Sequence, residues 1–134
     1  MAQAQQAPSG GVTPHLSVEG GDAALDFYKR AFAAEELSKM YGQDGKRLMH
    51  CHLRINGGSL MLNDIFAEFG MTRTPSPNYV MHLQVDDADA WWNRAVEAGC
   101  EVAMALGDQF WGDRYGQLTD PFGVRWSIGA AIKA

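Results

Sequence analysis

One short pattern opens each half of the chain, and this repeat constrains the fold more than any other feature. His15 begins the segment "HLSVEGGDAALDFYKRAFAAE", and His82 begins the segment "HLQVDDADAWWNRAVEAGCE". Both segments start His-Leu-x-Val-acid and continue with Asp-Ala, an aromatic pair, a basic residue and Ala. The two histidines are 67 positions apart, half of the 134 residues. We therefore expect two copies of one structural module.

Each copy has the pattern of a short strand followed by an amphipathic helix. The short run "VTPHLSVE" has the alternating residue pattern of a β-strand, which Gly20-Gly21 ends. Asp22 then stands near the start of a predicted helix. In the second copy Asp86 or Asp87 can cap the helix, and Gly99 is a natural stop. Apolar residues follow at helical spacing in both copies: Ala24, Phe27, Tyr28, Ala31 and Phe32, then Ala88, Trp91, Trp92, Ala95 and Val96.

Three strand-like runs follow each predicted helix. In the first half they are "ELSKMYG", "KRLMHCHLRI" and "SLMLND", and in the second half "CEVAMAL", "RYGQLTD" and "VRWSIG". Gln43-Asp44-Gly45, Asn56-Gly57-Gly58 and Asp120-Pro121-Phe122-Gly123 are turn signals between such runs. The sequence thus predicts an α+β fold of two βαβββ modules, whose curled mixed sheets surround a central cup.

The same patterns suggest where the modules begin and end. Residues 1–11 are rich in Gln, Ala, Pro, Ser and Gly, and we expect them to form a disordered tail. Residues 12–130 form one domain, with module one at 12–64 and module two at 79–130. Residues 65–78 carry Pro and Thr between the modules and are predicted to be a linker loop.

Composition excludes several classes of protein. The net charge is −5 and no run of Lys or Arg exceeds two residues, so a nucleic-acid partner is not expected. No stretch of about 18 apolar residues occurs, so no membrane span is expected. The N-terminus lacks the basic and apolar regions of a secretory signal. Cys51 and Cys100 are therefore predicted to be free thiols of a cytoplasmic protein, with a disulfide as the less favoured alternative.

These motifs resemble a known family. The segments "TPHLSVEGGDAALDFYKRAFAAEE", "MHCHLRINGGSLMLND" and "FWGDRYGQLTDPFGVRWSI" are similar to the PhnB-like branch of the vicinal oxygen chelate superfamily. That superfamily includes glyoxalase I, extradiol dioxygenases, and fosfomycin and bleomycin resistance proteins. The resemblance covers about residues 12–130 and implies the paired βαβββ fold. It also implies a homodimer, and an exposed Trp of the Trp91-Trp92 pair would suit a dimer contact.

The resemblance further implies a divalent metal in the cup, bound by the first strand of each module and by a Glu on a last strand. His15 and His82 match the first-strand positions, and imidazoles suit Zn²⁺, Fe²⁺, Ni²⁺ or Mn²⁺. The position of the Glu is occupied by Ser127, and the comparable strand of module one offers Met61 and Leu62. Two histidines without a carboxylate fall short of the three protein ligands usual for a catalytic metal, so a protein without a metal is the alternative.

His50 and His52 are further candidate site residues. They lie two positions apart in a predicted strand and so face the same side. The similar stretch of the PhnB-like branch reads His-Ala-Glu, so His52 stands here in the place of that Glu. If their side lines the cup, these two residues are candidate catalytic groups, and all four histidines of the protein would converge there. A structural role on the strand is the alternative for both.

The loop "FWGDRYG" is the candidate ligand-binding rim. Trp111 and Tyr115 would supply flat apolar walls, each with a polar group. Arg114 would pair with an anionic substrate or with Asp113. The alternative is a structural turn in which the charges face water and the aromatic rings pack beneath the loop.

Two functions of different classes follow, both involving a small-molecule partner. In the first, a glyoxalase-like metal-dependent enzyme (a lyase, isomerase or transferase) polarises its substrate with the ion and uses a His as general base. In the second, a metal-free protein of the bleomycin-resistance type binds or sequesters a small, partly aromatic or anionic ligand. A structural or interaction module with a vestigial cup is a third possibility. The sequence does not specify the substrate or the reaction.

Overall fold

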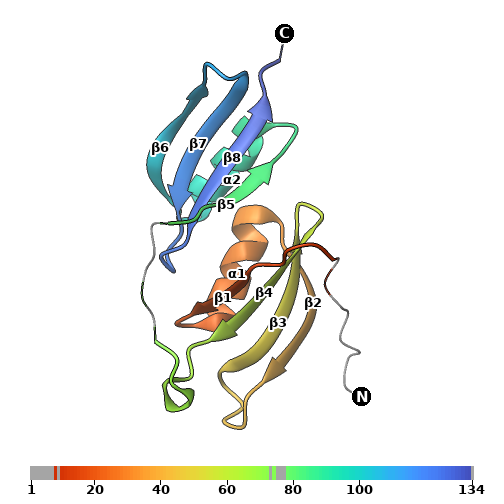
Figure 1. The fold of residues 1–134 in the computed structure, drawn as a ribbon, viewed down its shortest axis with the longest axis vertical. Coiled ribbons are helices and arrows are strands. Elements are labelled where there is room, and N and C mark those ends of the chain that lie inside the picture. The colour runs from red at the N-terminus through yellow and green to blue at the C-terminus, as the bar shows by residue number, and fades with distance from the viewer. Residues whose placement is uncertain (1–7, 9, 73, 75–77, 134) are drawn as a thin grey trace. The chain divides into compact units, whose positions relative to one another are not determined.

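A computed structural model describes residues 8, 10–72, 74 and 78–133 (Figure 1). The chain divides into two compact units, residues 1–29 with 33–74, and residues 30–32 with 75–134. Each unit contains one four-stranded sheet. Most of the tail predicted at residues 1–11 lies outside the described residues, and residues 8, 10 and 11 are exposed.

Sheet one belongs to the first unit. Its strands lie in the order β1-β4-β3-β2, with β1 parallel to β4 and the other neighbours antiparallel. The 3₁₀-helix η1 (Ala67–Phe69) lies in the segment predicted as a linker, and the preceding Phe66 is buried. The elements are β1 (His15–Val18), α1 (Gly21–Phe32), β2 (Glu35–Tyr41), β3 (Leu48–Ile55) and β4 (Gly58–Asp64).

Sheet two repeats this topology in the second unit. The strands lie in the order β5-β8-β7-β6, with β5 parallel to β8 and antiparallel pairs elsewhere. The elements are β5 (Met81–Gln84), α2 (Ala88–Ala98), β6 (Glu101–Asp108), β7 (Asp113–Thr119) and β8 (Arg125–Ala131). The predicted α+β fold of two βαβββ modules is therefore confirmed. The central cup stays a prediction.

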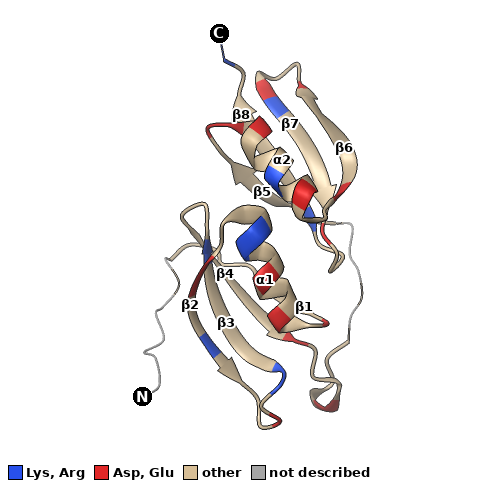
Figure 2. Ribbon diagram, turned by 180° about the vertical axis from the view of Figure 1, so that it is seen from behind, with Lys and Arg blue, Asp and Glu red and all other residues tan. Residues whose placement is uncertain are grey.

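Each sheet has one apolar face and one polar face. In sheet one, Leu16, Leu62 and Cys51 pair across neighbouring strands and are buried. In sheet two, Leu118 and Ile128 are fully buried on the side where Trp92 of α2 packs over Gly116. Figure 2 shows α1 lying in front of sheet one and α2 in front of sheet two. The apolar faces therefore form the cores, and the polar faces carry the four histidines.

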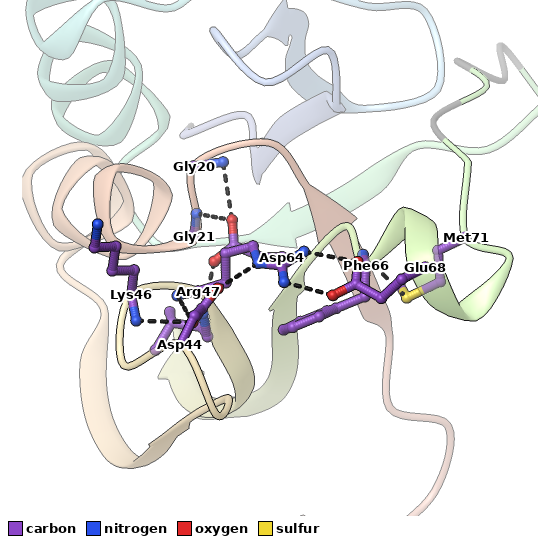
Figure 3. Close-up of polar contacts among 10 residues, drawn as sticks. Gly20, Gly21, Asp44, Lys46, Arg47, Asp64, Phe66, Glu68 and Met71 are labelled. Atoms are coloured by element: carbon purple, nitrogen blue, oxygen red, sulfur yellow. Dashed lines mark hydrogen bonds and ion pairs between the residues drawn. The ribbon is translucent and has the colours of Figure 1, made fainter.

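The two helices begin in different ways. Helix α2 carries its own N-cap, because the side chain of Asp87 accepts a hydrogen bond from Ala90 N at 3.1 Å. The N-cap of α1 is Gly20, which has a φ of 88° and no side chain to offer. Asp64 at the end of β4 takes that role, with Oδ1 accepting from Gly20 N at 3.0 Å and Gly21 N at 2.7 Å (Figure 3).

Asp64 also connects the start of α1 to the start of β3. Its Oδ2 accepts a hydrogen bond from Leu48 N at 2.7 Å, so a single buried carboxylate holds three backbone donors. Nearby, Arg47 binds Asp44 at 2.7 Å and Glu68 at 2.6 Å, which fastens the β2–β3 turn to η1 (Figure 3). Hydrogen bonds from Arg47 hold the pKa of Glu68 down at about 2. The loops around the start of α1 are thus tied together by charge-assisted hydrogen bonds.

The adjacent tryptophans of α2 have different surroundings, as their positions on the helix require. Trp92 is buried and its ring lies against Gly116, where an added Cβ would come within 2.6 Å of it. Trp91 is partly exposed and its ring stacks against the guanidinium of Arg94 at 4.5 Å. Trp91 is therefore the exposed tryptophan of the pair, and the dimer contact at this residue stays a prediction.

Both cysteines are free thiols, as predicted, and both are buried. Burial raises the pKa of the Cys51 thiol to about 11 and that of the Cys100 thiol to about 12. At pH 8 only about one Cys51 thiol in a thousand would then be a thiolate, the nucleophilic form. We expect Ellman's reagent to label neither thiol in the native protein at pH 8 and both in guanidinium chloride. Rapid labelling of the native protein would contradict this assignment.

Candidate functional site

Three of the four histidines lie on one side of sheet one. The register pairs His15 with Met61, and Met61 with His52, so these side chains share a face. His50 is two residues from His52 and lies on the same side. We call this side the polar face of sheet one; its members are His15, Ser17, His50, His52, Ser59 and Met61. The prediction that His50 and His52 face the same side agrees with this register.

The three histidines differ in their surroundings. His15 is exposed, whereas His52 is buried and its Nε2 lies 2.9 Å from Ser59 Oγ. The pKa of His50 is lowered, first by its partial burial and then by the positive charges of His15 and His52. A lowered pKa keeps His50 uncharged at neutral pH, which a general base requires. Across from His52, the buried hydroxyl of Ser38 has no hydrogen-bond partner among the described residues.

His82 lies in the second unit and both of its ring nitrogens have partners. Its Nδ1 lies 2.7 Å from Ser127 Oγ, and its Nε2 lies 2.8 Å from Gln84 Oε1. An amide oxygen can only accept, so Nε2 carries the proton and donates it to Gln84. In the neutral ring, Nδ1 then accepts from the Ser127 hydroxyl. No ring nitrogen of His82 retains a free lone pair for a metal ion.

The other ligand positions that the resemblance implies also lack the required chemistry. Ser127 pairs directly with His82 in the register, and Met61 occupies the same place beside His15. Neither residue offers a carboxylate. Within the described part of the chain, no group of three or more His, Cys, Asp or Glu side chains is arranged to hold a metal ion. The residues at these positions therefore do not fit the metal that the resemblance implies.

The face of sheet two that points away from α2 carries a connected set of polar side chains. We call it the polar face of sheet two; its members are His82, Gln84, Glu101, Asp113, Tyr115, Gln117, Thr119, Arg125 and Ser127. Arg125 Nε donates to Thr119 Oγ1 at 3.0 Å, and its Nη1 donates to Gln117 Oε1 at 3.1 Å. Gln117 Nε2 in turn donates to Tyr115 Oη at 3.1 Å. These bonds hold the guanidinium and the phenol on one surface.

Aromatic rings continue this surface toward the β6–β7 hairpin. Tyr115 stacks on the imidazole of His82 with 5.9 Å between the ring centroids, and Trp111 meets Tyr115 edge-on at 5.5 Å. Trp111 is 50% exposed and its neighbour Phe110 is 97% exposed. Large apolar rings left in water at the margin of a polar surface are typical of a ligand-binding edge. Trp111 and Tyr115 therefore lie together, as the rim prediction requires.

Arg114 lies elsewhere. It alternates with Tyr115 along β7 and so points to the side of α2. Its guanidinium makes ion pairs with Asp89 at 3.0 Å and Asp108 at 3.1 Å, rather than with Asp113. Both carboxylates raise the pKa of Arg114. Of the two partners that the sequence suggested for Arg114, Asp113 is therefore not bound in the structure, and Arg114 does not share a surface with Trp111 and Tyr115.

Arg125, Gln117 and Gln84 were not singled out in the sequence. Arg125 precedes Ser127 by two residues, so period-two alternation places both on one face. This two-residue spacing can be read in the run "VRWSIG", in which Ser127 occupies the position of the expected Glu. Gln117 follows Tyr115 by two residues and Gln84 follows His82 by two, so the same alternation places them beside those candidate residues.

Comparison with known proteins identifies the class. The family model described as the Glyoxalase/Bleomycin resistance protein/Dioxygenase superfamily matches residues 12–128, and the chain belongs to this superfamily. An uncharacterized Mycobacterium tuberculosis protein, Rv0887c, is 46% identical over 128 residues, which cover 91% of this chain and 75% of that protein.

Solved structures share the fold. The PhnB protein of Bacillus cereus superposes with a TM-score of 0.70 at 22% identity, covering 90% of this chain and 98% of that one. The fosfomycin resistance protein FosX of Listeria monocytogenes, complexed with Mn(II) and sulfate ion, gives a TM-score of 0.70 at 16% identity, covering 92% and 93% of the two chains. At these identities the similarity concerns the fold alone.

Among the described residues, no helix is long and apolar enough to span a membrane.

Proposed function

We propose that the protein binds a small organic molecule on the polar face of sheet two, without a metal ion at His82. The observation that carries this proposal is the pair of hydrogen bonds of His82, to Ser127 at 2.7 Å and to Gln84 at 2.8 Å. A metal at this imidazole would have to break one of them, and Ser127 supplies no negative charge in return. The half-exposed Trp111 ring supports a ligand surface at the same place.

The arrangement around His82 depends on a glycine. A Cβ added at Gly129 would lie 3.0 Å from His82 Cε1 and 3.2 Å from Gln84 Oε1. The absence of a side chain at Gly129 leaves room for the imidazole of His82 and the amide of Gln84 to approach β8 closely. The imidazole then stacks on Tyr115 instead of projecting from the sheet as a free ligand. This packing supports a role for His82 as part of a binding surface.

The second candidate function is the metal-dependent glyoxalase-type enzyme. It is favoured by His15, His50 and His52 on one face of sheet one, where partial burial, and then the charges of His15 and His52, lower the pKa of His50. In this alternative His50 and His52 keep the catalytic roles predicted for them. The homodimer and the cytoplasmic location also remain proposals, and sedimentation velocity would test the first of them.

Metal binding separates the two candidate functions. We expect protein purified without chelators, and then titrated calorimetrically with Mn²⁺, Zn²⁺ and Ni²⁺, to hold no stoichiometric ion. His15→Ala and His82→Ala should then leave the metal content unchanged. Ser127→Glu is the matched variant, because it supplies the carboxylate that the resemblance expects and removes the hydroxyl partner of His82. One ion per chain in the wild-type protein, lost in His82→Ala, would overturn the proposal.

A further inference from the structure

Around Arg125 and Tyr115, the proposed ligand surface presents hydrogen-bond donors. Arg125 has no acceptor atoms, and two of its nitrogens are already directed at Thr119 and Gln117. The oxygen of the Gln117 amide is used by Arg125, and its nitrogen donates to Tyr115 Oη. Because that phenol oxygen accepts from Gln117, its own O–H remains to be donated outward. A ligand that meets this surface must therefore bring acceptor atoms.

Arg125 makes no ion pair within the described residues, although the register places Glu101 beside Thr119 on the same face. Its partners Thr119 and Gln117 are neutral, and no carboxylate forms an ion pair with it in the part of the chain that the structure describes. Arg47 and Arg114 differ, because each makes ion pairs with two acidic side chains. In a chain of net charge −5, a half-buried guanidinium that acidic groups leave unpaired attracts an anion.

The guanidinium is also held in place before any ligand binds. Thr119 and Gln117 lie on β7 and fix the side chain of Arg125 along the sheet, next to the phenol of Tyr115. A donor pair that is already ordered loses little conformational entropy on binding. Arginine presents its donors in a planar fork that matches the two oxygens of a carboxylate.

The aromatic edge adds a second requirement. Trp111, Tyr115 and His82 form a continuous row of rings beside the donors, with centroid separations of 5.5 Å and 5.9 Å. The hairpin that carries Trp111 is fixed by hydrogen bonds from Gln109 N to Asp113 O at 2.8 Å and from Ile132 N to Gly112 O at 3.0 Å. A fixed, half-exposed indole beside a polar anchor is suited to stack on a flat ring.

We propose that the ligand is a planar aromatic or conjugated anion, whose acidic group binds Arg125 and Tyr115 while its ring stacks on Trp111. This inference rests on the proposed function and adds the chemical class of the ligand. It also transfers the anion-binding role, which the sequence pattern suggested for Arg114, to Arg125.

Two isosteric probes test the inference, 2-naphthoate and its neutral amide 2-naphthamide. We expect calorimetric titration of the full-length chain to show naphthoate binding at least tenfold more tightly than naphthamide. Arg125→Gln should remove that difference by weakening naphthoate alone, roughly tenfold to a hundredfold, since a charge-assisted hydrogen bond is lost. Trp111→Leu should weaken both probes. Arg114→Gln is the matched control on the opposite face, and naphthoate affinity should not change in it.

The outcomes separate the inference from the function on which it rests. Equal affinity for the two probes, unchanged in Arg125→Gln, would overturn the anionic ligand while leaving a binding surface. Absence of binding by either probe at millimolar concentration would overturn both. Circular dichroism of each variant verifies its fold, and Arg125→Lys provides a second variant that keeps the charge but loses the planar fork. We expect Arg125→Lys to bind naphthoate with intermediate affinity.

Discussion

Replacing Asp64 with Ala is expected to lower the free energy of unfolding by about 3 kcal/mol or more. The carboxylate is buried and accepts hydrogen bonds from Gly20 N, Gly21 N and Leu48 N, at 3.0, 2.7 and 2.7 Å. Alanine would leave three backbone donors without their acceptor, and a hydrogen bond to a charged group contributes about 1.5–3 kcal/mol. Urea unfolding followed by far-ultraviolet circular dichroism measures the change.

The control for Asp64 is the other helix cap. Asp87→Ala removes only one hydrogen bond, to Ala90 N, and should cost about 1 kcal/mol. Asp64→Asn should fall between the two alanine variants, because the amide keeps one oxygen but directs an N–H group at a backbone donor. If Asp64→Ala and Asp87→Ala destabilise the protein equally, the triple acceptor role of Asp64 is wrong.

The second large effect is expected at Asp120, the first residue of the turn before β8. Asp120 Oδ1 accepts from Phe122 N at 2.8 Å and Val124 N at 3.0 Å, and its Oδ2 accepts from Trp126 Nε1 at 2.9 Å. Asp120→Ala should cost about 3 kcal/mol, since it leaves these donors unsatisfied in a buried place. The fluorescence of Trp126 should also change, because its indole loses its partner.

Asp120→Asn tests whether the carboxylate, and not merely its shape, is needed. Asparagine can satisfy either the backbone donors or the indole, but its amide nitrogen then faces another donor, so most of the destabilisation should persist. Asp113→Asn lies at the start of β7, away from these donors, and should alter stability by less than about 0.5 kcal/mol. An Asp120→Asn variant as stable as the wild-type protein would contradict the role of the Asp120 carboxylate.

Much of the fold follows from local patterns in the sequence. The spacing from Ala24 to Phe32 predicts α1, alternation predicts the strands, and the Asn56-Gly57 pair predicts the β3–β4 hairpin. The helix cap at Asp87 was also predictable, because its acceptor and donor are three residues apart. The role of Asp64 was not, since the residue that caps α1 comes from a strand 44 positions later than Gly20.

The candidate site was predictable only in part, for reasons of geometry. The departure at Ser127 could be seen in the sequence, and the register of the structure places Ser127 beside His82. Arg114 and Tyr115 stood together in one motif, yet adjacent residues of a strand face opposite sides. Which of them shares a surface with Trp111 depends on the side that α2 covers, and this follows from packing over the whole sheet.

The borrowed cap of α1 has a consequence for the order of folding. Helix α2 has its cap three residues away, so its first turn can form as soon as that short segment exists. The first turn of α1 gains its acceptor only after β4 has been synthesised and has paired beside β1. The entropy of closing this long loop is lost before the hydrogen bonds of Asp64 can stabilise the helix. Helix α1 should therefore consolidate after α2, although it is synthesised before α2.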